Sequence, residues 1–147
     1  MKDKTIDYIL RTTWLAVQKM YNEEAAKFES TMATGFTLLS IDREEGTPST
    51  ALGPKMGMEA TSLSRILKTM EAKGLIERKP NPKDGRGVII SLTDFGLEKR
   101  AYSREKVLTF NEAIKSKVSE EKLNSFYEVA EVINDMVLNK KIYNQND

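Results

Sequence analysis

Hydrophobic residues recur every three or four positions from residue 4 to residue 29, which is the period of one face of an α-helix. The pattern predicts a single long amphipathic helix, whose apolar stripe needs a larger surface than a short neighbouring helix can offer. The stripe consists of Ile6, Ile9, Leu10, Trp14, Val17, Met20, Tyr21, Ala25 and Phe28. A second helix is expected over residues 32–44, with Gly46 ending it.

Two short helices joined by a glycine-containing turn are predicted over residues 47–74. Thr47-Pro48 is a typical helix start, because a hydroxyl caps free amides and proline at the first helical position loses no hydrogen bond. Gly53-Pro54 keeps this helix short. The following helix begins at about Glu59 and stops at Lys73-Gly74, a basic last turn followed by glycine. Together they form a helix-turn-helix pattern.

A β-hairpin is predicted after the two short helices. Residues 75–79 and 88–93 read as paired strands, and the second alternates between apolar and other positions along most of its length. The connecting sequence is PNPKDGRG, in which Asp84-Gly85 predicts the hairpin turn. The C-terminal third is helical again: Thr93 can cap one helix and Ser119 the next.

The predicted fold is mainly α with a small two-stranded β wing, in one domain that covers residues 1–147. A winged helix-turn-helix at 32–96 is flanked by a helical dimerisation region at 1–31 and 97–147. The flanking helices carry apolar stripes that a winged helix of some sixty residues cannot cover. A second copy of the chain is the simplest cover, so we expect a homodimer.

Composition excludes most catalytic chemistry. The chain contains no cysteine and no histidine, which removes disulfides, thiolates, histidine bases and nearly every transition-metal site. We therefore expect neither an enzyme nor a metal or other cofactor. No apolar run is long enough to span a membrane, and the first ten residues do not form a signal peptide. A cytoplasmic protein without a membrane partner is the default expectation.

Positive charge gathers in the middle of the chain, although the net charge is only +1. Residues 55–86 hold eight basic and four acidic side chains, whereas the rest of the chain holds 15 basic and 18 acidic ones. This distribution indicates a localised anion-binding surface, as expected of a protein that binds nucleic acid. A solvated helix face would give the same count.

The second short helix has one apolar and one polar face. Leu63, Ile66, Leu67 and Met70 form the apolar face, which we expect to be core. The opposite face presents short polar donors and cations, namely Thr61, Ser62, Ser64, Arg65 and Lys68. An α-helix fits the major groove of DNA, and short polar side chains near its start let the backbone approach base edges. Any exposed helix face can look similar, so the pattern alone leaves both interpretations open.

The hairpin tip offers a thin, basic loop. Arg86 stands between two glycines, and a narrow minor groove attracts an inserted arginine. Arg86 is therefore the candidate for the groove, with Lys79 and Lys83 on the phosphates. Asp84 either holds the arginine in place or only shapes the turn.

An ordered set of motifs runs from Ala51 to Gly96. It comprises Leu52, Met56-Gly57, Thr61-Ser62-Leu63-Ser64-Arg65, Met70-Glu71-Ala72-Lys73-Gly74-Leu75-Ile76, Asp84-Gly85-Arg86 and Leu92-Thr93-Asp94-Phe95-Gly96. In this order the chain resembles the MarR (multiple antibiotic resistance regulator) family of bacterial transcription factors, and the resemblance extends over its whole length. It departs from the family pattern at Glu59 and Ala60, where a serine cap and a polar or basic residue are usual.

The resemblance implies a homodimeric repressor that binds double-stranded DNA at a pseudo-palindromic operator. It also implies release by a small phenolic or lipophilic effector near the meeting point of the first two helices, where the candidates are Trp14, Tyr21, Met32 and Phe36. Core packing is the favoured interpretation for any single one of these four residues. The alternative function is a winged helix that binds other proteins without reading DNA sequence.

Overall fold

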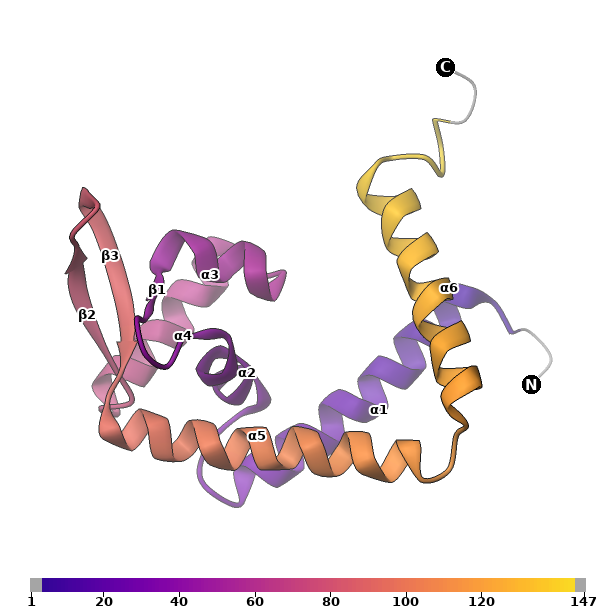
Figure 1. The fold of residues 1–147 in the computed structure, drawn as a ribbon, viewed down its shortest axis with the longest axis horizontal. Helices are drawn as coiled ribbons and strands as arrows, with labels where there is room; N and C mark the ends of the chain where they lie inside the picture. The colour runs from indigo at the N-terminus through magenta and orange to yellow at the C-terminus, as the bar shows by residue number, and fades with distance from the viewer. Residues whose placement is uncertain (1–3, 145–147) are drawn as a thin grey trace. The chain divides into compact units, whose positions relative to one another are not determined.

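The computed structural model describes residues 4–144, and its two compact units divide between Glu105 and Lys106. Helices dominate both units, and a small sheet lies within the first (Figure 1). The elements in chain order are α1 (Ile6–Ala26), α2 (Met32–Ser40), β1 (Thr47–Pro48), α3 (Ser49–Met56), α4 (Ala60–Ala72), β2 (Ile76–Asn81), β3 (Asp84–Leu92), α5 (Asp94–Lys115) and α6 (Glu120–Leu138). The predicted mainly α fold with a β wing is confirmed.

The second helix is shorter than predicted. It begins at Met32, where the Thr31 hydroxyl accepts a hydrogen bond from the Thr34 amide at 3.2 Å, but it ends at Ser40 and not near residue 44. Ile41 is extended and buried, and Asp42 Oδ1 then accepts from the amides of Glu44 and Glu45 at 2.9 and 2.8 Å. A turn held by the Asp42 side chain therefore replaces the last turn of the predicted helix.

Thr47-Pro48 forms a strand, so the prediction that it starts a helix is wrong. The Thr47 hydroxyl accepts a hydrogen bond from the Asp42 amide at 2.8 Å, which closes the preceding turn and leaves no role in capping α3. The two residues pair with β3, Thr47 opposite Ile90 and Pro48 opposite Ile89. The sheet is therefore three-stranded and antiparallel, in the order β1-β3-β2, with one more strand than the predicted hairpin.

The helix-turn-helix is formed by α3 and α4. Gly57 has a left-handed φ of 65° and ends α3, as the glycine-containing turn predicted. Leu63, Leu67 and Met70 of α4 are buried as expected, and Ile66 packs against them. The common core joins α2, α3, α4 and the sheet through Leu38, Ile41, Leu52, Leu63, Leu67, Met70, Leu75, Ile76 and Ile90.

The hairpin turns two residues earlier than predicted. Pro82 and Lys83 form the turn, whereas Asp84-Gly85 already belongs to β3. The register changes beside the turn, since Pro80 pairs with Val88 but Asn81 pairs with Asp84. Residues 85–87 are consequently left outside the regular ladder, and the arginine at their centre lies on an irregular stretch of backbone.

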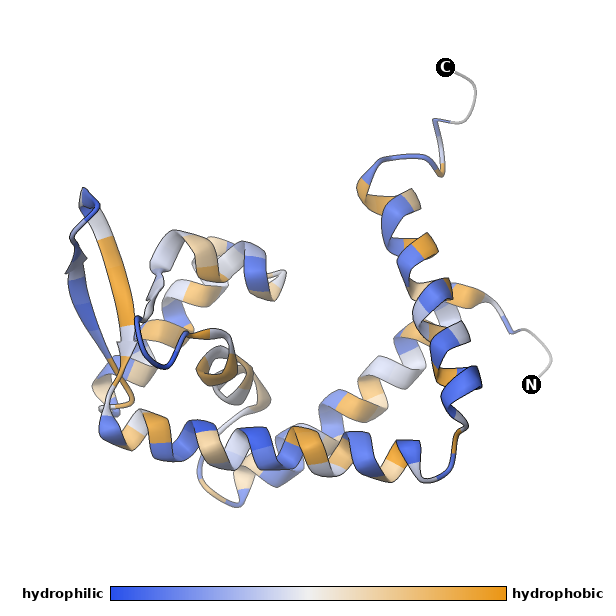
Figure 2. Cartoon of the chain, viewed as in Figure 1, coloured by the Kyte–Doolittle hydropathy of each residue, from blue (hydrophilic) through white to orange (hydrophobic). Residues whose placement is uncertain are grey.

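The helices α1 and α6 bury none of their residues within this chain. Figure 2 shows hydrophobic residues interspersed with hydrophilic ones along α6. The most exposed large apolar residues of the two helices are Ile6, Leu15, Trp14, Phe126, Val129, Val132, Val137 and Leu138. In residues 4–144 no helix combines the length and the hydropathy needed to cross a membrane.

Candidate nucleic-acid interface

The outer face of α4 carries the five residues that the sequence predicted for DNA. All five are exposed while the opposite face of the helix is buried in the core. Positions 61, 64, 65 and 68 follow the helical repeat, so they share one side of α4, and residue 62 borders it. The structure thus brings Thr61, Ser62, Ser64, Arg65 and Lys68 together on one accessible surface.

The start of α4 lacks a side-chain cap. Glu59 occupies the N-cap position with extended backbone, but its carboxylate makes no capping hydrogen bond. The first amides of a helix carry partial positive charge and have no partner inside the helix, so they can donate to a phosphate or to water. Glu59 and Ala60 are both exposed at this end, beside the face described above.

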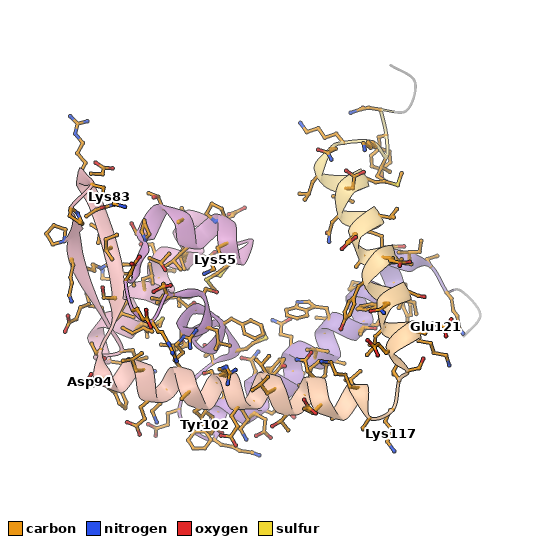
Figure 3. The ribbon with its side chains drawn as sticks, viewed as in Figure 1. Lys55, Lys83, Asp94, Tyr102, Lys117 and Glu121 are labelled. Carbon is orange, nitrogen blue, oxygen red and sulfur yellow. The ribbon has the colours of Figure 1, made fainter. Side chains whose placement is uncertain are left out.

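The far end of the β2–β3 hairpin presents the predicted wing residues. Lys79, Lys83 and Arg86 are exposed, and Figure 3 places Lys83 toward the hairpin tip. The Arg86 amide donates to Asp84 Oδ1 at 3.0 Å. Asp84 therefore contacts the backbone of the arginine and shapes the loop. Within residues 4–144 the Arg86 guanidinium forms no ion pair, which leaves it available for an external anion.

Two basic residues of strand β2, Arg78 and Lys79, have carboxylate neighbours. Arg78 Nε lies 3.2 Å from Glu71 Oε2, which links β2 to α4, and Lys79 Nζ lies 3.7 Å from Glu77 Oε2 along the same strand. Both partners of the second pair are more than half exposed, so Lys79 can exchange that weak contact for a phosphate. The sequence did not predict the Glu71–Arg78 pair, because a turn at Gly74 separates its members.

The predicted effector residues are partly brought together where α1 meets α2. The rings of Tyr21 and Phe36 pack edge to face with centroids 5.5 Å apart. The Met32 amide donates to Asn22 Oδ1 at 3.0 Å, so the start of α2 also lies against α1. Burial raises the pKa of the Tyr21 phenol. Trp14 lies seven residues before Tyr21 on α1, and its side chain is half exposed.

The helix-turn-helix, the three-stranded sheet and the basic hairpin together define a winged-helix protein. A family model matches residues 31–88, which include both helices of the motif and most of the wing. The matching model is that of the MarR family, so residues 31–88 of the chain are similar to this family.

Known proteins extend this similarity. The HTH-type transcriptional regulator SarZ of Staphylococcus haemolyticus is 28% identical over 90 residues, or 61% of each chain. The multiple antibiotic resistance protein MarR of Escherichia coli is 32% identical over 78 residues, which cover 53% of this chain and 54% of that protein. These alignments therefore span only about half to three-fifths of the relatives.

Among solved structures, the MepR–DNA complex of S. aureus superimposes with a TM-score of 0.81 at 20% identity. The superposition covers 90% of this chain and 99% of that one. At this level of identity the match establishes the fold.

Proposed function

We propose that this protein is a sequence-specific transcriptional regulator that represses genes by binding DNA as a homodimer. The observation that carries the proposal is the exposed polar and basic face of α4 in the same compact unit as a basic hairpin. The relatives named SarZ and MarR are a transcriptional regulator and a multiple antibiotic resistance protein, and the MepR structure is a DNA complex. Since DNA is the partner, the proposed place of action is the cytoplasm.

In this proposal α4 enters a major groove and the wing reaches the adjacent minor groove. Thr61, Ser62 and Ser64 are short enough to let the helix approach base edges, while Arg65 and Lys68 reach bases or phosphates. Arg86 inserts into the minor groove, whose narrow A·T-rich stretches attract arginine.

Lys79 and Lys83 then lie along the phosphate backbone, where lysine acts as a point charge. These two contacts fix the position of the hairpin on the duplex without reading sequence.

A second copy of the chain covers the apolar surfaces of α1 and α6 in this proposal. Phe126 and Val132 are 60% and 59% exposed in the single chain, and burial of such side chains stabilises an association. A twofold axis then implies two half-sites about one helical turn, ~34 Å, apart on a pseudo-palindromic operator.

A small lipophilic or phenolic effector would act beside Tyr21 and Phe36, with Trp14 and Met32 as further contacts. The helix α2 connects this effector position to the helix-turn-helix core through Leu38. A ligand bound beside Tyr21 and Phe36 can therefore favour one distance between the two α4 helices of the dimer over another. The effector releases DNA only if it binds the conformation whose α4 spacing does not fit DNA more tightly than the DNA-binding conformation.

The decisive experiment is a fluorescence anisotropy titration against the DNA upstream of the protein's own gene, with scrambled DNA of equal length as control. We expect tighter binding to the upstream DNA and a steep loss of affinity as salt rises, because phosphate contacts release counterions. A winged helix that serves only protein contacts would bind neither duplex at low salt. Equal affinity for both duplexes would contradict sequence-specific readout.

A further inference from the structure

A second basic cluster lies in the same compact unit, around a hollow of about 900 Å³ between α2, α3 and α5. Arg100 and Arg104 line the hollow from one face of α5, since they are one helical turn apart. Arg43 lines it from the connection that follows α2. Lys55, labelled in Figure 3, extends from α3 and donates to the Ser40 carbonyl at 2.6 Å. Three separate segments of the chain thus direct cations to one place.

The wall of this hollow carries excess positive charge. Its ionisable residues are Arg43, Lys55, Arg100 and Arg104 with Asp42 and Glu44. The excess is therefore two positive charges. Asp42 is already engaged: its carboxylate accepts from the Glu44 and Glu45 amides, which lower its pKa most, and the nearby Lys55 and Arg100 lower it further.

The arginines of the hollow have no anionic partner of their own. Among residues 4–144, none of the guanidinium groups of Arg43, Arg100 and Arg104 forms an ion pair within 4.0 Å. The Nε–H of Arg100 is also buried without a hydrogen-bond acceptor in the described structure. A buried donor without a partner is costly, and such groups in folded proteins are usually satisfied by a bound ion or water.

We propose that this hollow binds a small dianionic solute through carboxylate or phosphate groups. A charge of two neutralises the excess on the wall, and guanidinium groups bind both kinds of oxyanion through paired hydrogen bonds. The site differs in residues and chemistry from the junction of Tyr21 and Phe36, which is aromatic. It does not depend on the DNA-binding function, because the solute is bound and measured without DNA.

The test is isothermal titration calorimetry of the full chain with citrate and with glycerol phosphate, and with glycerol as the uncharged control. We expect one molecule of an anion to bind per protomer and glycerol not to bind. The variants Arg100→Gln and Arg104→Gln should each weaken the affinity by about tenfold or more. The matched control Arg11→Gln removes an exposed cation from α1, outside the hollow, and should leave the affinity unchanged.

Several results separate this site from general attraction of anions. Binding of only one of the two anions supports the site and identifies the group that it prefers. Absence of binding by both anions at millimolar concentration overturns the proposal, and so does an equal loss of affinity in Arg11→Gln and Arg104→Gln. A melting curve of each variant shows whether it is folded. Arg104 is exposed, so Arg104→Gln should fold and still test the proposal if Arg100→Gln does not fold.

Discussion

Gly96 lies directly against the carbonyl group of Leu75. A Cβ atom built on Gly96 would be 2.0 Å from the Leu75 oxygen and 3.0 Å from its carbon. The same carbonyl accepts a hydrogen bond from the Thr93 amide at 3.1 Å, and the Thr93 hydroxyl accepts from the Gly96 amide at 3.0 Å. These contacts join the start of α5 to the chain between α4 and β2. They explain physically why threonine and glycine stand three positions apart here.

The variant Gly96→Ala should be strongly destabilised. Within a helix alanine is normally preferred over glycine by about 1 kcal/mol, but here the added methyl meets backbone atoms that no rotamer change can move. We expect a loss of about 1–3 kcal/mol or more in the free energy of unfolding, measured by urea denaturation. The control Gly85→Ala, whose Cβ would meet no atom within 4 Å, should unfold close to the wild type. Equal stability of the two variants would contradict the close contact.

The sequence predicted the elements whose pattern is local and long. The helices α1 and α4 were recognised because an apolar repeat continues over several turns, and the buried face of α4 followed from the same repeat. The strand β1 was missed because it has two residues and its partners Ile89 and Ile90 lie far along the chain. No local pattern specifies such a pairing.

Side-chain hydrogen bonds account for the other two differences. Asp42 and Thr47 close a turn where hydrophobic spacing alone favoured continued helix. The hairpin turned at Pro82-Lys83 and not at Asp84-Gly85, because the pairing of β2 with β3 sets the register and Asp84 binds the Arg86 amide instead. The basic hollow was not predicted for the related reason that its cations come from three distant segments.

The variant Glu59→Ser should be more stable and should bind DNA more tightly. Serine is a good N-cap residue, whereas the Glu59 side chain makes no cap hydrogen bond. We expect a gain of roughly 0.5–2 kcal/mol in the free energy of unfolding. Removal of a carboxylate beside the proposed DNA-binding face should also raise affinity for scrambled DNA. A gain only for scrambled DNA, with a loss for the upstream DNA, would show that Glu59 reads a base.

The variant Arg86→Ala should lose DNA affinity without losing stability. Its side chain is exposed and forms no ion pair within residues 4–144, so its removal should leave the melting temperature near that of the wild type. The magnitude of the slope of log affinity against log salt concentration should decrease by about one, as expected when one contact to a phosphate is lost. Arg86→Lys keeps the charge and tests the shape of the guanidinium. Unchanged affinity in the alanine variant would exclude the minor-groove role.

The Asp42 turn should give a pH-dependent contribution to stability. Hydrogen bonds from the Glu45 and Glu44 amides hold the pKa of Asp42 below its usual value of 3.8. A depressed pKa in the folded state means that the stabilisation is present above about pH 4 and is lost as the pH falls through the lower folded value. The variant Asp42→Ala should therefore melt below the wild type at pH 7, and the difference should narrow toward pH 3. A difference that stays constant over this range would contradict the prediction.

The variant Val132→Asp should convert the protein from dimer to monomer. Val132 is 59% exposed on α6, a helix that buries none of its residues within the chain, so a partner must cover it in the proposed dimer. A carboxylate placed in that contact would be desolvated without a partner, which is costly. Multi-angle light scattering at micromolar concentration should give twice the chain mass for the wild type and for the control Asn134→Asp, and the chain mass for Val132→Asp. A monomeric wild type would refute the dimer, and with it the binding of two half-sites by one particle.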